Sequence, residues 1–544
     1  MNQNGEYYQP TTITVPEDIT SISSYAFYKW RSLSSIQFHK NITSIGRYAF
    51  QYCTGLTSVV IPDSVISIGI DAFANCKNLS NVTLSKSLTE ISGHLFAYCD
   101  SLQSITIPHG VQTIGSYAFY ECDNLQRIYI PSSISSISSW AFNYCNNLRK
   151  VYYSGTVEDW CKLSTYPRFH TTVDFYISNN YVLLKDVSIP ETITELKSYI
   201  FNYFSITSVV MHDNITKIGS EAFNYCTSLK TVELPSSLTS INGSTFAYCS
   251  ALTNIVLPEN LKDIGSYAFR NSGINTITIP GNVDSIGADC FTNCTKLHTV
   301  VLNDKLKLIN DLFQGCSALQ NITIGLGITS VRNGSFANCS NMKNVYYNGA
   351  IEDWCNIVFE STNACPFISN QGKQGDFYIL DNTGEYSLVT EINLTSLDAL
   401  SKINDYTFYG FTSITTLVLS DNISEIGDNA FTRCKSLANV DLGNSLETIG
   451  YGAFSGCTSL IDLTIPTSVT QISNYALAIG NATTKNVVMT FDNETPPSLA
   501  SSTVFLYDAL LNIKVPAISL DLYRGATVFS VVHSYDPTII IAKS

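Results

Sequence analysis

The sequence predicts a mostly β solenoid, in which a parallel ladder of short strands is joined by short helical or 3-10 turns. Three observations lead to this fold class. An aromatic residue recurs every 22 or 23 residues, the segment before it reads as short strands, and one repeat has a single apolar face that it cannot bury alone. We expect about seventeen repeats. The recurring positions are Phe27, Phe50, Phe73, Phe96, Phe119, Phe142, Phe201, Phe223, Phe246, Phe269, Phe291, Phe313, Phe336, Phe408, Phe431 and Phe454, with Leu477 in the last copy.

Each repeat reads as L-x-x-I-x-I-P-x-x-V-x-x-I-G-x-x-A-F-x-x-C, and residues 56–78 illustrate it. The stretch "SVVIP" alternates with period two and is rich in β-branched residues, so we expect a short strand. Pro62 ends that strand because proline cannot donate to a ladder. Val65 and Ile68 form a second extended piece, and Gly69 stands where a side chain would crowd a turn. The segment "DAFANC" is expected to form the short helical or 3-10 turn that returns the chain.

The I-G-x-x-A-F-x-x-C pattern resembles the BspA-like leucine-rich repeats, and the resemblance covers about residues 10–485. The period also lies inside the leucine-rich range of about 20–29 residues. The resemblance implies a curved leucine-rich-repeat solenoid at a cell surface, used for adhesion to host proteins or to other cells. It implies no enzyme and no cofactor.

Breaks in the period divide the chain into caps, repeat blocks and inserts. The two inserts share "EDWC" and a later "DFYI", which indicates a higher-order duplication. Because an array end exposes apolar surface, we expect a cap at each terminus. The predicted parts are an N-terminal cap 1–15, repeat block 1 at 16–153, insert 1 at 154–187, repeat block 2 at 188–348, insert 2 at 349–394, repeat block 3 at 395–486 and a C-terminal cap 487–544.

Each insert carries one tryptophan after a helix-start signal. Thr156 is placed to cap a short helix with Asp159 at its third position. Trp160 and Trp354 would then anchor the two helices against the solenoid, and both are also candidate binding residues. A structural spacer is the favoured interpretation of the inserts, with a dedicated binding site as the alternative.

Cysteine recurs at one position of the repeat, which we call the cysteine slot. Trp30, Phe204, Ser272 and Phe411 fill the same slot in other repeats, and a metal site or disulfide would not tolerate such substitution. We therefore expect a ladder of buried reduced thiols in preference to sporadic disulfides, with metal binding last. Cys355 and Cys365 share insert 2 and could pair, but Cys161 of insert 1 has no corresponding partner. The slot cysteines are Cys53, Cys76, Cys99, Cys122, Cys145, Cys226, Cys249, Cys294, Cys316, Cys339, Cys434 and Cys457.

Composition argues against several other functions. The 544-residue chain is 45% apolar and 14% charged, and its net charge of −14 disfavours binding to nucleic acid. No stretch approaches the about 20 apolar residues that a membrane helix needs. The seven histidines have no zinc-site spacing, and no nucleophile or phosphate-loop motif is present, so we expect no enzyme and no metal site.

The outward positions of the strands form the face on which a partner would bind. Most of them are Ser, Thr, Asn or Val, but Arg127, Tyr129, Lys150 and Tyr152 occupy adjacent repeats beside the first insert. Tyr346 repeats the arrangement beside the second. Because Tyr and Arg are enriched at binding hot spots, we predict a partner contact at each insert junction. The alternative is that these tyrosines pack under the inserts.

The leading functional hypothesis is a non-enzymatic protein that binds a protein or glycan on a cell surface. A structural component of a virion or surface assembly is the second hypothesis, and an intracellular interaction scaffold is the third. Residues 1–16 lack a basic segment followed by an apolar run, so they show no signal peptide. Either a signal was removed before this numbering or the protein is not exported by that route. The location alternatives are thus cell surface or secreted, virion-associated, and cytoplasmic.

Overall fold

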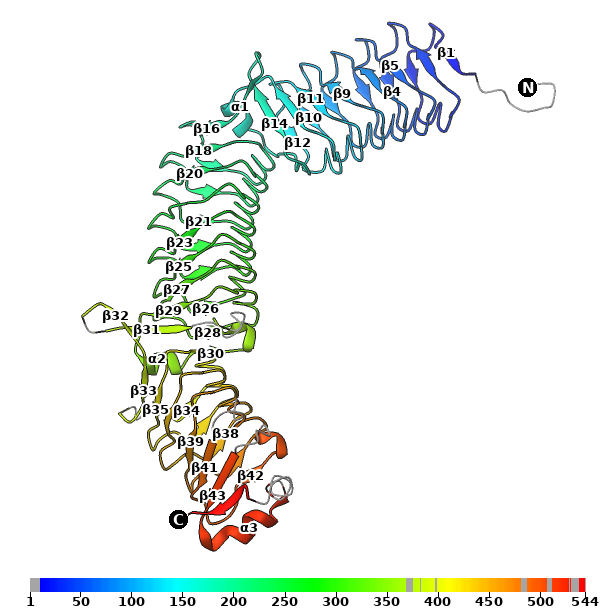
Figure 1. Cartoon of the computed structure of the whole chain (residues 1–544). Coiled ribbons are helices and arrows are strands. Elements are labelled where there is room, and N and C mark those ends of the chain that lie inside the picture. Colours follow the sequence, from blue (N-terminus) through cyan, green and yellow to red (C-terminus); the bar gives the residue numbers. More distant parts are fainter. Residues whose placement is uncertain are drawn as a thin grey trace, which may run out of the picture. The chain divides into compact units, whose positions relative to one another are not determined.

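The computed structural model of the chain divides into two compact units. The first holds Met1–Leu261 with Tyr267–Gly273, and the second holds Lys262–Ser266 with Ile274–Ser544. Each unit is a stack of coils with short parallel strands, which confirms the predicted solenoid (Figure 1). The structure describes residues 10–367, 375–381, 383–396, 399–480, 487–505, 511–527, 529 and 538–543.

Most coils contribute one strand to each of two ladders. In the third repeat, β5 (Ser58–Val60) pairs in parallel with β7 (Asn81–Thr83) of the next coil. The shorter β6 (Ser67–Ile68) follows after Pro62. A Cβ atom added to Gly69 would lie 2.5 Å from the backbone nitrogen of Arg47, so the predicted need for glycine is confirmed.

The remaining elements of the first unit follow the same scheme. The longer ladder contains β1 (Thr12–Thr14), β3 (Ser35–Gln37), β9 (Ser104–Thr106), β11 (Arg127–Ile130), β13 (Lys150–Tyr153), β16 (Asp186–Ser188), β18 (Ser208–Val210) and β20 (Thr231–Glu233). The shorter strands are β2 (Ser21–Ile22), β4 (Ser44–Ile45), β8 (Glu90–Ile91), β10 (Thr113–Ile114), β12 (Ser136–Ile137), β17 (Glu195–Leu196), β19 (Lys217–Ile218) and β21 (Ser240–Ile241). The first insert supplies α1 (Val157–Cys161), β14 (Asp174–Ile177) and β15 (Val182–Leu183).

The second unit repeats the two ladders. Its longer strands are β23 (Thr276–Thr278), β25 (Thr299–Val301), β27 (Asn321–Ile324), β29 (Asn344–Tyr347), β33 (Glu391–Asn393), β35 (Thr416–Val418), β37 (Asn439–Asp441), β39 (Asp462–Ile465), β41 (Val487–Phe491), β43 (Leu511–Val515) and β44 (Ile540–Ala542). Its shorter strands are β22 (Asp263–Ile264), β24 (Ser285–Ile286), β26 (Leu308–Ile309), β28 (Ser330–Val331), β30 (Val358–Phe359), β34 (Lys402–Ile403), β36 (Glu425–Ile426), β38 (Thr448–Ile449), β40 (Gln471–Ile472) and β42 (Ser498–Leu499). The other elements are α2 (Ile351–Cys355), η1 (Thr362–Ala364), β31 (Asp376–Leu380), β32 (Tyr386–Leu388), η3 (Ser502–Val504), η4 (Ala517–Ser519) and α3 (Leu520–Gly525).

The short helical or 3-10 turn expected over the Ala-Phe step is instead a series of tight turns with left-handed residues four positions apart. In the second repeat, Tyr48 and Tyr52 have φ angles of 58° and 63°. Their N–H groups donate to the carbonyls of Ile70 (3.1 Å) and Ala74 (3.0 Å) in the next coil, whereas Gln51 donates to Tyr48 of its own coil (3.2 Å). A helix would use all these donors internally, so the demand for bonds between coils prevents one.

Stacked phenylalanines fill the interior between the ladders. Phe50, Phe73 and Phe96 are fully buried, with ring centroids 5.1 Å and 5.8 Å apart and planes inclined by 4° and 16°. Rings from successive coils therefore form a continuous stack, and each coil depends on its neighbours to bury its ring.

The cysteine slot lies beside this stack. All sixteen cysteines are buried and outside disulfides, so the predicted burial of the slot is confirmed. The Cys122 Sγ donates to the Phe96 carbonyl at 3.1 Å, and other slot thiols make the same bond to the phenylalanine of the preceding coil. Burial raises the pKa of the Cys53 thiol to about 12 and that of Cys122 well above its usual value. The slot residues are thus small packed side chains in their protonated form.

The inserts and the predicted caps also supply rungs to the ladders. β14 of insert 1 pairs in parallel with β13, and β31 of insert 2 pairs with β29. At the C-terminal end, β41 pairs with β39 and β43 with β41, so the ladder continues past residue 487. At the other end, β1 already forms a rung within the predicted cap 1–15, of which residues 1–9 lie outside the described residues. Strand pairing needs backbone groups in register, and these segments supply them without the repeat's side chains.

Candidate binding site

The structure brings four of the predicted site residues together on neighbouring rungs of one ladder. β11 and β13 pair in register, which places Arg127 opposite Lys150 and Tyr129 opposite Tyr152. Their side chains share one face because alternate residues of a strand point the same way. Arg127 and Lys150 are exposed, and both tyrosines are half-buried. We call this cluster, together with Tyr181 of the insert, the first junction surface.

The tyrosines of this surface form a stack that the sequence indicated only in part. The ring centroids of Tyr129 and Tyr152 are 4.6 Å apart, and Tyr176 of β14 extends the stack at another 4.6 Å. Tyr181, in the turn between β14 and β15, packs its ring edge-on against Tyr129 at 5.9 Å and Tyr152 at 5.2 Å. The insert therefore packs against these tyrosines on one side, as the alternative interpretation expected, but leaves them half-exposed.

A basic cleft lies next to the stack. Gln126, Arg127, Asn147, Arg149 and Lys150 line a cleft of about 330 Å³. The Arg149 Nη1 donates to the carbonyl of Asn146 at 2.9 Å, which fixes this guanidinium at the surface. Three cationic side chains therefore line one cleft, in a chain whose net charge is −14.

The carboxylate beside Lys150 on the next rung is already engaged. Asp174 lies opposite Lys150 in the register of β13 and β14. Its Oδ1 accepts a hydrogen bond from the Ser205 hydroxyl at 2.6 Å and lies 3.8 Å from the Lys185 Nζ. Asp174 is therefore held by groups other than Arg127 and Lys150.

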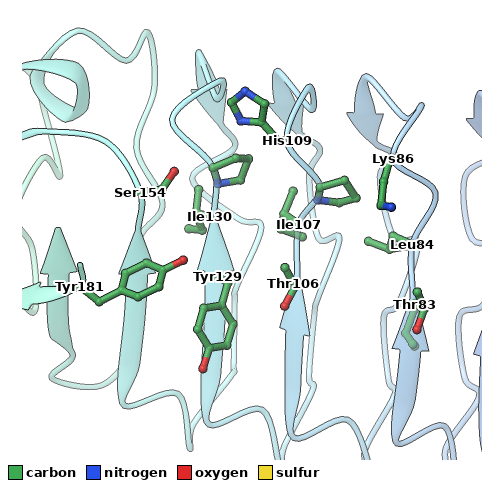
Figure 2. A pocket seen from close by; sticks show the side chains of 13 residues that line it. Thr83, Leu84, Lys86, Thr106, Ile107, His109, Tyr129, Ile130, Ser154 and Tyr181 are labelled. Atoms are coloured by element: carbon green, nitrogen blue, oxygen red, sulfur yellow. The ribbon is translucent and has the colours of Figure 1, made fainter. Parts of the chain in front are cut away.

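A larger cleft of about 590 Å³ opens on the other side of Tyr129 (Figure 2). Thr83, Thr106 and Tyr129 come from successive strands, and Tyr181 reaches in from the insert. Its other lining residues are Val82, Leu84, Lys86, Ile107, Pro108, His109, Ile130, Pro131 and Ser154. The volume falls within the range of about 300–1,000 Å³ that is usual for small-molecule sites.

The prediction that Trp160 and Trp354 contact a partner is wrong. Trp160 is 1% exposed and its Nε1 donates to the Ile200 carbonyl at 2.8 Å. Trp354 is fully buried and donates to the Thr407 carbonyl at 2.9 Å. A large indole with its N–H satisfied is most stable in the core, so both residues anchor the insert helices, as was also predicted.

The second junction has the insert scaffold but a different face. Tyr346 stacks on Tyr378 of β31 at 4.8 Å, and Tyr386 of β32 packs edge-on against Tyr346 at 5.1 Å. Thr323 occupies the place that Tyr129 has in the first unit, and Asn344 the place of Lys150. Tyr346 stays a predicted contact residue, on a surface without the basic cluster.

Sequence reasoning missed four tyrosines of the two junctions. Tyr176 and Tyr378 both belong to the repeated "DFYI", whose alternation could have placed them on the outward face. Tyr181 and Tyr386 belong to the antiparallel arms β14–β15 and β31–β32, which have no counterpart in the repeat. Periodicity carried no signal for these two.

The described residues offer no arrangement that indicates catalysis. No three or more of their His, Cys, Asp and Glu side chains stand close enough to hold a metal ion. Within the described part of the chain, no helix is both long and apolar enough to cross a bilayer. The first junction surface presents stacked aromatic rings, cations and two clefts.

Comparisons with known proteins agree with the repeat pattern. No curated protein matches the chain. A leucine-rich repeat protein from Bacteroides ovatus is 24% identical, with 84% of this chain and 88% of that chain covered and a TM-score of 0.38. A leucine rich cell surface protein from Faecalibacterium prausnitzii is 22% identical over 64% of this chain and 90% of that chain, with a TM-score of 0.36. The family model for the BspA type leucine rich repeat region matches residues 6–100, 43–166, 171–297, 262–369 and 379–495. The chain therefore belongs to the BspA-type leucine-rich repeat family.

Proposed function

We propose that this protein is a non-enzymatic adhesin that binds a protein or glycan of a cell surface through the first junction surface. The BspA-type family consists of repeat proteins of the protein-binding or adhesion kind, which supports the general function. The location at the cell surface and the use of this particular surface are parts of the proposal.

One observation carries the choice of surface: basic and aromatic residues cluster where the rest of the face is small and polar. Arg127, Arg149 and Lys150 line one cleft next to the stacked Tyr129 and Tyr152. Tyrosine and arginine are enriched among residues that dominate binding energy. Cations on a chain of net charge −14 would also direct an anionic region of a partner to this place.

The test is retention of the labelled full chain on epithelial and bacterial cells, measured against salt concentration. The double variant Arg127→Glu/Lys150→Glu reverses the basic cluster, and we expect it to reduce retention by about tenfold or more. Retention of the unaltered protein should fall as salt rises, because exposed charges are screened.

The second junction supplies the matched control. Asn321→Glu/Asn344→Glu places the same two carboxylates on the equivalent rungs of β27 and β29, and retention should stay within about twofold of the unaltered protein. Equal losses in the two double variants would contradict the choice of the first junction surface. Unchanged retention in the first double variant would contradict it as well.

A further inference from the structure

We infer that the larger cleft beside Tyr129 binds a neutral glycan, with one pyranose ring stacked on the free face of the Tyr129 ring. This inference rests on the proposed function and names the partner class for the same surface. The cleft extends from Thr83 across Thr106 to Tyr129, and Tyr181 stands at its end (Figure 2).

The first step of the argument is the open end of the tyrosine stack. Tyr152 covers one face of the Tyr129 ring, at a centroid distance of 4.6 Å and an angle of 9°. On the other side, the residue in register with Tyr129 is Thr106, whose side chain is too short to cover a ring. A planar or chair-shaped ring placed over Thr106 would continue the stack at about the 4.8 Å spacing of the rungs.

Tyr181 gives this end of the stack a fixed position. Its ring is edge-on to Tyr129 and Tyr152, and its own backbone is in the left-handed region with φ of 50°. The Tyr181 N–H donates to the Ser178 carbonyl at 3.0 Å, which closes the turn. A ligand ring would therefore meet an aromatic face that is held before binding, which lowers the entropy lost on association.

The floor of the cleft offers hydroxyl groups that suit a ligand ring with hydroxyls at its edge. Thr83 and Thr106 are exposed and offer hydroxyls on the two rungs beside Tyr129. Ser154 Oγ accepts the Ser132 N–H at 2.8 Å and still has its hydroxyl proton to donate. A pyranose has an apolar C–H face for Tyr129 and hydroxyls around its edge for these groups.

The same floor disfavours an aromatic side chain of a protein partner. A phenylalanine stacked on Tyr129 would cover the Thr106 hydroxyl without bonding it, and buried polar groups without partners are costly. Within this cleft, unlike in the basic cleft lined by Arg127 and Lys150, charge does not select an acidic glycan. The Lys86 Nζ at the rim lies 3.6 Å from an Asp63 oxygen, so its charge is partly balanced already.

The experiment is saturation-transfer NMR on the full chain with a panel of neutral oligosaccharides of glucose, galactose, mannose and N-acetylglucosamine at millimolar concentration. At least one sugar should receive magnetisation, strongest at the C–H protons of one ring face. Tyr129→Thr, which copies the residue of the second junction, should weaken its affinity by about tenfold or more. Tyr129→Phe keeps the ring and should stay within about threefold.

Two controls accompany this measurement. Thr323→Val alters the equivalent rung of the second unit and should leave the affinity unchanged, and circular dichroism confirms the fold of each variant. Absence of binding by every sugar, or equal affinity of Tyr129→Thr and the unaltered chain, would overturn the inference. Binding of a Phe- or Trp-containing peptide at Tyr129 without any sugar would assign the cleft to a protein partner and overturn it too. Salt-sensitive cell retention that depends on Arg127 and Lys150 would leave the proposed function standing in either case.

Discussion

The buried indole of Trp160 provides a direct test of the anchoring role of the insert. Its Nε1 donates to the Ile200 carbonyl at 2.8 Å, and its ring lies 4.6 Å from Phe175 and 5.3 Å from Tyr153. The variant Trp160→Phe retains an aromatic ring but removes the donor, whereas Trp160→Ala removes the ring as well. The two variants therefore separate the hydrogen bond from the packing.

The magnitudes follow from these contacts. Trp160→Phe leaves the Ile200 carbonyl buried without its donor, so the free energy of unfolding should fall by about 1–3 kcal/mol. Trp160→Ala adds a large cavity in a site that is 1% exposed, and it should lower the free energy by about 3–5 kcal/mol or more. The matched control is Trp140→Phe, because Trp140 is 42% exposed and a surface change should stay within about 0.5 kcal/mol.

The assay combines urea denaturation, followed by circular dichroism, with amide hydrogen exchange on the native protein. Because each coil of a repeat array contacts only its neighbours, protection should fall in α1, β13 and β14 and change little in distant rungs. A Trp160→Phe variant as stable as Trp140→Phe would refute the reasoning. Lost cell retention with unchanged stability in Trp160→Ala would instead identify a direct binding role and refute it from the other side.

Three further predictions concern the interior and the insert. Burial raises the pKa of the Cys53 thiol to about 12. The slot thiols should therefore react slowly with a disulfide reagent near pH 8 in the native protein and react fully after unfolding. Fast labelling of the native protein would contradict their burial. Burial, with a contribution from a nearby guanidinium, lowers the pKa of His170 below its ordinary value. In the unfolded chain His170 then binds a proton that it does not bind in the folded chain, so the free energy of unfolding should fall as pH drops below about 6.5. Melting curves of His170→Phe should show a smaller fall in melting temperature on acidification than those of the unaltered chain. Thr156→Ala removes the acceptor of the Asp159 N–H (3.1 Å) and leaves a helix start like that of α2, where Ala350 stands at this position. Urea denaturation should show a free energy of unfolding lower by about 1 kcal/mol. An unchanged free energy would mean that the cap is dispensable.

The repeat core could be predicted from the sequence because its residues obey the period. Phe73, Cys76 and Gly69 were placed correctly by spacing and by the substitutions that their positions tolerate. The Ala-Phe turn was not, since its left-handed residues include Tyr48 and Tyr52 rather than glycine. Secondary-structure propensities reflect hydrogen bonds within a segment. These residues adopt the left-handed conformation because their N–H groups then donate to carbonyls of the neighbouring coil.

The candidate site shows the same division. Arg127, Tyr129, Lys150 and Tyr152 were found because strand alternation assigns them to one face, and the register confirms their adjacency. Tyr181 could not be found, because it lies in an antiparallel arm whose packing onto the tyrosines depends on the fold. Tyr181, which lies outside the repeat pattern, is the residue at the end of the cleft.

Comparison of the two junctions separates scaffold from recognition. Trp160 and Trp354 both donate to a carbonyl in the following repeat, and each packs against the phenylalanine of its "DFYI" strand, at 4.6 Å and 4.8 Å. Their outward faces differ, with Tyr129 in one and Thr323 in the other. Core positions of the inserts are therefore constrained by packing, while the face above them is free to vary. We expect specificity to depend on the residues that differ between the two junctions, which include Tyr129 as well as Arg127 and Lys150. Replacement of Tyr129 by threonine should therefore convert the first face toward the second without disturbing the core.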